Sequence, residues 1–137
     1  MANLRTLAES QNFLLCHEFE QVYVIEKDRH RRLKAGAHYG DPTCGLISHD
    51  ESWFATGGEG VIVFSIRAGI QSYLRNGDPT FHISAMRLES RNDLRILVDP
   101  WSDVASVWRL NPDTAELTKL RDGPDLRDEP YSDNVEF

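Results

Sequence analysis

The stretch Trp53-Phe54-Ala55-Thr56-Gly57-Gly58-Glu59-Gly60-Val61-Ile62-Val63-Phe64 decides the fold class of this chain. Its two ends are apolar, aromatic and β-branched, which is the composition of β-strands. The glycine-rich centre supplies the positive φ angles that a tight turn needs. The stretch therefore predicts a hairpin with strands at 53–56 and 61–64. The centre lacks the Lys-Ser/Thr pair of a phosphate-binding loop, so we interpret it as a turn.

Further strands are expected on both sides of this hairpin. β-branched and aromatic residues, or alternation of apolar and polar residues, predict strands at 20–26, 81–88, 94–98 and 104–110, and shorter ones at 33–39, 44–48 and 116–120. Pro100 cannot donate to a strand ladder, so the strand at 94–98 should end before it. Consecutive strands usually pair, and this pattern predicts antiparallel meanders.

One segment after the hairpin has the period of a helix. Four apolar residues recur at i, i+4, i+7 and i+8, namely Ile66, Ile70, Tyr73 and Leu74. Asn76-Gly77 followed by Pro79 is typical of a helix C-terminus. We therefore expect a helix near 67–76.

A second, shorter helix is expected at the start of the chain. Asn3 is a suitable cap, and Leu4, Leu7 and Ala8 fall on one helical face. The predicted fold class is α+β, mostly β, in which antiparallel meanders close as a twisted sheet or small sandwich with one helix near 67–76. The length of 137 residues predicts a single domain, 1–137.

The composition limits the compartment that we expect. No run approaches 18 apolar residues, so no transmembrane helix is expected. The first residues, Met1-Ala2-Asn3-Leu4-Arg5, do not resemble a secretory signal. Two cysteines, Cys16 and Cys44, are too few for a disulfide scaffold. A cytoplasmic protein with free thiols fits these features best.

Charge is distributed unevenly along the chain. There are 15 Lys and Arg residues against 22 Asp and Glu, for a net charge of −7. Residues 27–34 hold five basic residues and one acidic residue, whereas the loop-like segment 122–137 holds six acidic residues and one arginine. Nucleic-acid binding needs clustered positive charge, so neither a nucleic acid nor a membrane is an expected partner. A basic protein partner is expected.

Reactive side chains concentrate around one cysteine. Cys44 with His38 or His49 has the residue types of a cysteine nucleophile and its base. A zinc site could draw on Cys16, His17, His38, Cys44 and His49, but the spacing of these residues does not match that of paired zinc ligands. We expect no catalytic residue, no metal and no cofactor, and interpret Cys44 as a buried, inert thiol.

Two tryptophans receive different interpretations. Trp108 alternates with Val104 and Ser106 and should share their strand face in the core. Trp101 lies in a turn, where an exposed indole is a candidate anchor for a protein partner.

Two segments resemble parts of a WD40-type propeller blade. Residues 49–64 combine a polar turn, a strand, a Gly-rich turn and a second strand, and Val107–Leu117 is similar to the outer hairpin of a blade. A blade takes about 40–45 residues and a ring at least four blades. The chain has room for three at most, so we interpret the likeness as convergent hairpin chemistry.

The chain as a whole resembles the immunity proteins of bacterial contact-dependent, type VI and polymorphic toxin systems. The likeness rests on small size, acidic charge and α+β patterning, and on the stretch Tyr39-Gly40-Asp41-Pro42-Thr43-Cys44 leading into Trp53. The resemblance implies a non-enzymatic protein that occludes the active site of a cognate toxin domain. An acidic inhibitor would be steered to a basic cleft.

From the charge pattern, and from the turn position of Trp101, we expect eight partner-binding residues, Asp50, Glu51, Glu59, Trp101, Asp125, Asp128, Glu129 and Asp133. Two other functions stay open. One is a small regulatory or ligand-binding β-rich domain with an aromatic-lined pocket, and the other is a hydrolase that depends on cysteine or a metal. The residues do not predict the oligomeric state.

Overall fold

A computed structural model describes residues 4–73 and 81–137, and these residues form twelve strands in three four-stranded antiparallel sheets. The first sheet contains β1 (Arg5–Glu9), β2 (Phe13–Glu18), β3 (Gln21–Glu26) and β4 (Arg31–Ala37). The second contains β5 (Cys44–Ile47), β6 (Phe54–Gly58), β7 (Gly60–Ser65) and β8 (Gly69–Tyr73). The third contains β9 (Ile83–Ser90), β10 (Asp93–Val98), β11 (Ser106–Asn111) and β12 (Glu116–Asp122).

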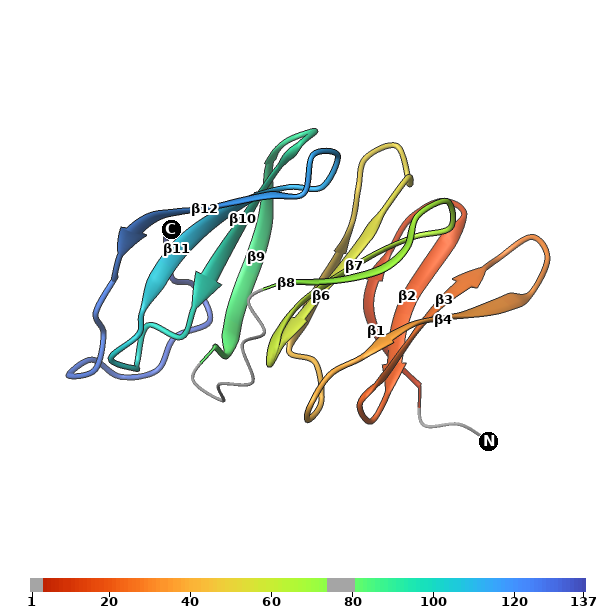
Figure 1. The fold of residues 1–137 in the computed structure, drawn as a ribbon. Coiled ribbons are helices and arrows are strands. Elements are labelled where there is room, and N and C mark those ends of the chain that lie inside the picture. The colour runs from red at the N-terminus through yellow and green to blue at the C-terminus, as the bar shows by residue number, and fades with distance from the viewer. Residues whose placement is uncertain (1–3, 74–80) are drawn as a thin grey trace.

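Each sheet is a simple meander, and the three sheets stack side by side (Figure 1). The first strands of successive sheets are neighbours, because β1 contacts β5 and β5 contacts β9. A four-stranded meander is also the unit of a propeller blade. The second sheet therefore lies between the other two.

The middle position of the second sheet explains its apolar sequence. Every residue of β6 is buried, and so are all residues of β7 except Ser65. Alternation along β6 sends Phe54 toward the first sheet and Ala55 toward the third, so each joins a different hydrophobic core. A sheet covered on both faces needs nearly continuous apolar strands, which is why the hairpin that turns at Glu59 is easy to find in the sequence.

The mostly-β prediction and the six principal strands are confirmed within two or three residues at their ends. The sheets do not close as one twisted sheet or a two-layer sandwich. The buried apolar residues instead form two hydrophobic cores, one on each side of the second sheet.

The helix expected near 67–76 is wrong for the residues that the structure describes. Strand β8 occupies Gly69–Tyr73 and pairs with β7, while 74–76 lie outside the described residues. Ile66 and Ile70 are 52% and 50% exposed, so their helical spacing does not correspond to a buried face. A helical period on an exposed edge strand is coincidental.

The helix expected at the start is also wrong, since β1 occupies Arg5–Glu9. The register of β1 against β2 shifts between Thr6 and Ala8, as in a β-bulge. Leu7 and Ala8 both pack on the same core because of this shift. Two consecutive apolar residues facing one side imitate the i, i+3, i+4 pattern of a helix.

The described part of the chain contains no apolar helix of membrane-spanning length. The meanders place their connections at two opposite ends of the stack (Figure 1). One end carries the connections β2–β3, β4–β5, β6–β7 and β10–β11, and the other carries β1–β2, β3–β4, β5–β6, β7–β8, β9–β10 and β11–β12.

Candidate protein-interaction surface

The two ends of the stack differ in charge. We call the end formed by residues 19–20, 38–43, 59 and 99–105, together with 123–133 that follow β12, the acidic end. These described residues include one arginine, Arg127, and nine acidic residues, namely Glu20, Asp41, Glu59, Asp99, Asp103, Asp125, Asp128, Glu129 and Asp133. The described connections of the opposite end hold four acidic and four basic residues. The negative charge of the protein is therefore gathered at one end.

Hydrogen bonds between connections hold the acidic end together. The His38 backbone N–H donates to the Glu20 carbonyl at 3.0 Å, and the Gly60 N–H donates to the Phe81 carbonyl at 2.9 Å. The Asp99 N–H donates to the His82 carbonyl at 2.9 Å. These bonds join neighbouring connections, so the carboxylates are presented by an ordered surface.

The segment after β12 has no strand or helix from Gly123 onward, as the loop-like prediction expected, and it is attached to the third sheet. The Gly123 N–H donates to the Ala105 carbonyl and the Leu126 N–H to the Pro100 carbonyl, both at 2.7 Å. The Arg87 guanidinium donates to the main-chain oxygen of Phe137 and lies over its ring, 5.2 Å from the centroid. The acidic segment is thus fixed at several points.

This attachment covers the outer face of the third sheet. Leu97 and Val107 are paired across β10 and β11 and face away from the core shared with the second sheet, yet both are buried. Arg87 lies on this same face, beside Arg95. Its contacts with Phe137 place the end of the chain over the face, so the segment acts as a cover for apolar residues there.

The Trp101 indole contacts the acidic C-terminal segment of the same chain, whereas the sequence predicted an exposed indole that binds a partner. Its indole N–H donates to the Glu129 carbonyl at 3.0 Å, and its ring lies 5.0 Å from that of Tyr131. Tyr131 is 73% exposed and forms the outer member of this pair. Trp108 shares the face of Ser106, to whose hydroxyl its indole donates at 2.9 Å, and it packs against the core as predicted.

The structure divides the eight expected partner-binding residues between the two ends. Glu59, Trp101 and the four acidic residues of the C-terminal segment belong to the acidic end. Asp50 and Glu51 lie in the β5–β6 connection at the opposite end. The predicted meander implies the separation of Glu59 from Asp50 and Glu51, because consecutive turns of antiparallel strands lie at opposite ends.

Asp50 and Glu51 make contacts within the protein. The Asn12 backbone and side-chain N–H groups donate to Glu51 at 3.0 and 2.7 Å, and the Ser10 hydroxyl also donates to it. These hydrogen bonds hold the pKa of Glu51 below its usual value, and the bond from the Ser10 hydroxyl contributes most. The Arg91 guanidinium lies 3.3 Å from Asp50. The β5–β6 connection therefore links the second sheet to both neighbours.

The cysteine that suggested a nucleophile has a raised pKa. Burial raises the pKa of the Cys44 thiol to about 11, although a hydrogen bond from the Thr43 hydroxyl at 3.8 Å opposes the shift. A thiol with this pKa is protonated at neutral pH, and the thiol is not the nucleophilic form. The interpretation of Cys44 as an unreactive side chain gains physical support from this environment.

The histidines near Cys44 point to structural contacts. His38 is buried, and its Nε2 lies 2.8 Å from the Thr56 hydroxyl. His17 is buried with Nδ1 2.9 Å from the Phe19 carbonyl, and His49 is exposed. Among residues 4–73 and 81–137, no group of three or more His, Cys, Asp or Glu side chains is placed to hold a metal ion.

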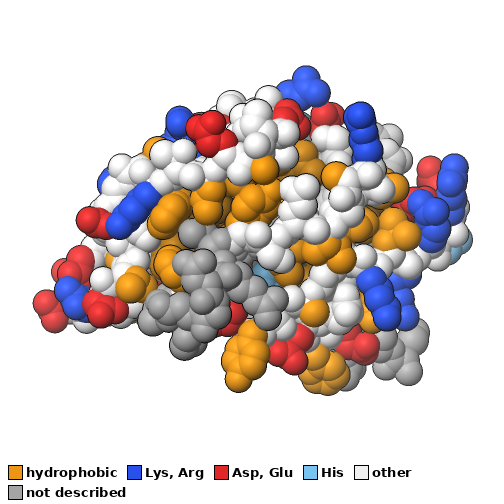
Figure 2. Space-filling view, in the orientation of Figure 1, with side chains coloured by type: hydrophobic (Ala, Val, Ile, Leu, Met, Phe, Trp, Pro, Cys, Tyr) orange, Lys and Arg blue, Asp and Glu red, His pale blue; other side chains and the backbone are white. Residues whose placement is uncertain are grey.

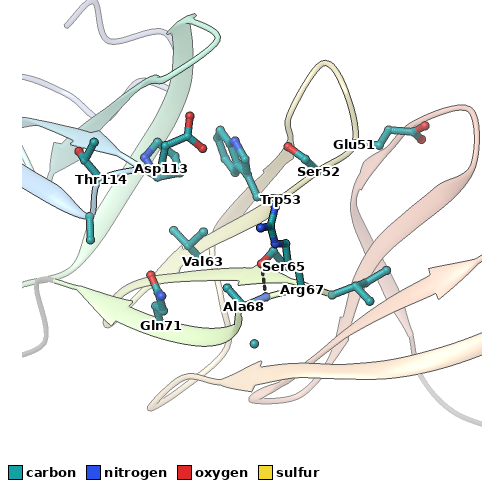
Figure 3. A pocket seen from close by; sticks show the side chains of 14 residues that line it. Glu51, Ser52, Trp53, Val63, Ser65, Arg67, Ala68, Gln71, Asp113 and Thr114 are labelled. Atoms are coloured by element: carbon teal, nitrogen blue, oxygen red, sulfur yellow. Dashed lines mark hydrogen bonds between the residues drawn. The ribbon is translucent and has the colours of Figure 1, made fainter.

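A groove of about 630 Å³ lies between the β7–β8 hairpin and the β11–β12 turn (Figure 3). Trp53 and Val63 line it on the second sheet, and Asp113 and Thr114 face them from the third. Trp53 is the single aromatic residue among its described lining residues. This lining differs from the aromatic-lined pocket that a ligand-binding domain was expected to have.

The sequence analysis did not identify two aromatic residues of the acidic end as exposed candidate contact residues. Phe19 lies in the β2–β3 connection and Tyr39 in the β4–β5 connection. Their positions could have indicated exposure. Phe19 immediately precedes the predicted strand 20–26, and Tyr39 is the last residue of the predicted strand 33–39. Composition alone does not distinguish such residues from buried ones.

Comparison of the chain with protein-family models and with curated proteins gives no match.

Proposed function

We propose that this protein binds a basic protein domain through its acidic end and neutralises it, in the manner expected of a toxin-immunity protein. The observation that supports this proposal is the charge difference between the ends, with nine carboxylates and one arginine at one end against four charges of each sign at the other. A concentrated field of one sign steers a partner of opposite sign and raises its association rate.

The attachment of the C-terminal segment supports the same proposal. A segment already held by Ala105, Pro100 and Arg87 loses little conformational freedom when a partner binds. Its exposed carboxylates, Asp128, Glu129 and Asp133, are then available to meet positive charge. Asp125 is paired with Arg127 at 2.7 Å and contributes less net field.

The partner to test first is the C-terminal domain of a toxin encoded by a neighbouring gene. Co-expression of this chain with that domain in a bacterial host should restore growth, whereas the toxin domain alone should arrest it. Binding of the two purified proteins should then be measured as association kinetics at low and at physiological salt. The association rate should fall as salt rises, because the Debye length shortens to about 8 Å at physiological salt.

Charge variants at the two ends give a matched comparison. Replacing Asp125, Asp128, Glu129 and Asp133 by Asn or Gln should lower the association rate roughly tenfold or more, with a smaller change in dissociation. The control removes the same number of charges elsewhere, at Glu9, Asp28, Asp113 and Glu116, and should leave the rate within about twofold. Equal effects of both variants, or an unchanged rate in the first, would remove the acidic end from the interface.

A further inference from the structure

Phe19 occupies an unfavourable position for a phenylalanine. It is the first residue of a two-residue turn between Glu18 and Gln21, and its φ angle is 52°. Glycine is the residue that suits positive φ at this position of a hairpin. The ring is also 68% exposed. Backbone strain and an exposed ring both oppose stability, and such residues concentrate at functional surfaces.

Contacts from neighbouring residues hold this turn in place. The buried His17 ring lies 2.9 Å from the Phe19 carbonyl through Nδ1. The next residue, Glu20, accepts hydrogen bonds from the backbone N–H groups of His38 and Gly40, the first through its carbonyl and the second through its carboxylate. The β2–β3 turn and the β4–β5 connection are therefore joined as one unit.

Tyr39 lies between the two residues that bond to Glu20. It is 74% exposed, the largest exposed fraction among the large apolar side chains that the structure describes. Phe19 and Tyr39 thus present two rings from adjoining connections. Glu20, which follows Phe19, joins these connections through its hydrogen bonds with His38 and Gly40. In Figure 2, hydrophobic and acidic side chains lie side by side along the lower edge of the molecule.

A small cavity adjoins the first ring. It has a volume of about 280 Å³ and is lined by Leu4, Arg5, His17, Phe19 and Asp41. Among the lining residues, Arg5 carries a positive charge and Asp41 a negative one. Glu20, which follows Phe19, adds a second carboxylate nearby. Exposed rings beside carboxylates are the surroundings in which a guanidinium or ammonium group binds, because the ring face and the carboxylate both attract a cation.

We propose that Phe19 and Tyr39 are the anchor residues that receive arginine or lysine side chains of the basic protein partner. This inference rests on the proposed function and names the contact point of the same acidic end. Charge steers the partner to the surface, and the two rings then hold its cationic side chains, since a few aromatic anchors dominate the energy of most interfaces. The strain at Phe19 is retained because the ring is needed there.

The test uses the full chain and a nine-residue arginine peptide as the probe, titrated by calorimetry at low salt. Unmodified protein should bind the peptide, and the double variant Phe19→Ala, Tyr39→Ala should bind it at least tenfold more weakly. Ile66→Ala is the control, because it removes an exposed apolar side chain from the opposite end of the stack. It should change the affinity by no more than about twofold.

A second variant separates a binding role from a structural one. Phe19→Gly relieves the positive φ angle, so it should raise the unfolding temperature while weakening peptide binding at least fivefold. It also keeps the inference testable if an alanine variant folds poorly. A merely structural Phe19 would give a stabler protein with unchanged affinity, and that result would overturn the inference.

The outcomes distinguish this inference from the proposed function. Normal binding by the aromatic double variant, with binding lost when the carboxylates of the C-terminal segment are neutralised, would overturn the anchor assignment alone. Equal binding by the unmodified, aromatic and charge-neutralised proteins would overturn both. Lack of measurable binding by the unmodified protein would also overturn the anchor assignment, whereas the growth test with the toxin domain would still decide the function.

Discussion

The Nε2 atom of His38 lies 2.8 Å from the Thr56 hydroxyl, and this bond joins the end of the first sheet to the centre of the second. Both side chains are buried. A buried polar pair costs little while it is satisfied and much when one member is removed. The contact therefore fixes how two adjacent sheets sit against each other, and it leads to the first prediction.

Removing either member of this pair should destabilise the protein. His38→Ala and Thr56→Val should each lower the free energy of unfolding by about 1–3 kcal/mol, because each leaves a buried polar group with a lost partner. The double variant should lose less than the sum of the two. Urea titrations of the four proteins measure the coupling, and strictly additive losses would show that the two side chains do not depend on each other.

Acid should destabilise the protein through Asp50. Hydrogen bonds from the Ser52 hydroxyl and backbone N–H and from the Ser48 hydroxyl lower the pKa of Asp50 to about 2. A carboxyl with a lowered pKa in the folded state adds stability above its ordinary pKa of about 3.9, and this contribution disappears as pH falls toward 2. Unfolding midpoints measured at pH 5 and pH 2 should fall less in Asp50→Asn than in the unmodified protein. An identical fall in both would contradict this assignment.

The two cysteines should react slowly with thiol reagents in the folded protein. Burial raises the pKa of Cys44 to about 11 and raises that of Cys16 as well. Labelling at pH 7.5 should be slow and should reach two thiols only after denaturation. Cys44→Ala should retain partner binding and lose only stability. Fast labelling of Cys44, or loss of function in a well-folded Cys44→Ala variant, would reopen the hydrolase interpretation.

Gly57 should not tolerate a side chain. A Cβ atom added there would lie 2.7 Å from Ile83 Cγ2 and 2.9 Å from Cys44 Sγ. Gly57→Ala should therefore lower the free energy of unfolding by about 1–3 kcal/mol through overpacking. Gly69→Ala is an informative comparison, since no atom lies within 4 Å of an added Cβ and the cost comes from its φ of +80° alone. The thermal midpoint of each variant measures the two costs separately.

Removal of residues 124–137 should expose the face that they cover. Leu97 and Val107 would lose their cover, so we expect a lower unfolding temperature and stronger binding of a hydrophobic dye. Sedimentation should show self-association of the shortened chain. A control with Asp125, Asp128, Glu129 and Asp133 neutralised keeps the segment in place and should show neither effect. Unchanged dye binding after truncation would indicate that the segment does not shield the face.

The parts of the fold that follow from local composition could be predicted, and the parts that depend on context could not. The hairpin at 53–64 is visible because a strand buried on both faces must be apolar throughout. Three strands, β1, β2 and β8, were not predicted, and β1 and β8 were missed for two different reasons. A bulge between Thr6 and Ala8 disturbs the alternation of β1, and Ile66 and Ile70 at the edge of the second sheet are half exposed.

The candidate surface shows the same limit. The sequence identifies the acidic C-terminal segment, because charge density is a property of composition. The predicted meander already places Glu59 at the end opposite Asp50 and Glu51. The end at which the C-terminal segment lies depends on β8, which the sequence pattern predicted as part of a helix. The exposed state of Phe19 and Tyr39 likewise depends on what packs around each connection.

The cover formed by the C-terminal segment has a consequence for how this architecture can change in size. Both internal boundaries are contacts between one sheet and the next, whereas the outer face of the third sheet is closed by an irregular segment. A duplicated unit of four strands inserted between existing sheets would pack against a sheet on each side, as the second sheet does now, and would leave the cover intact. A unit appended after β12 would first have to displace the cover. Lengthening by internal duplication is therefore the less disruptive route.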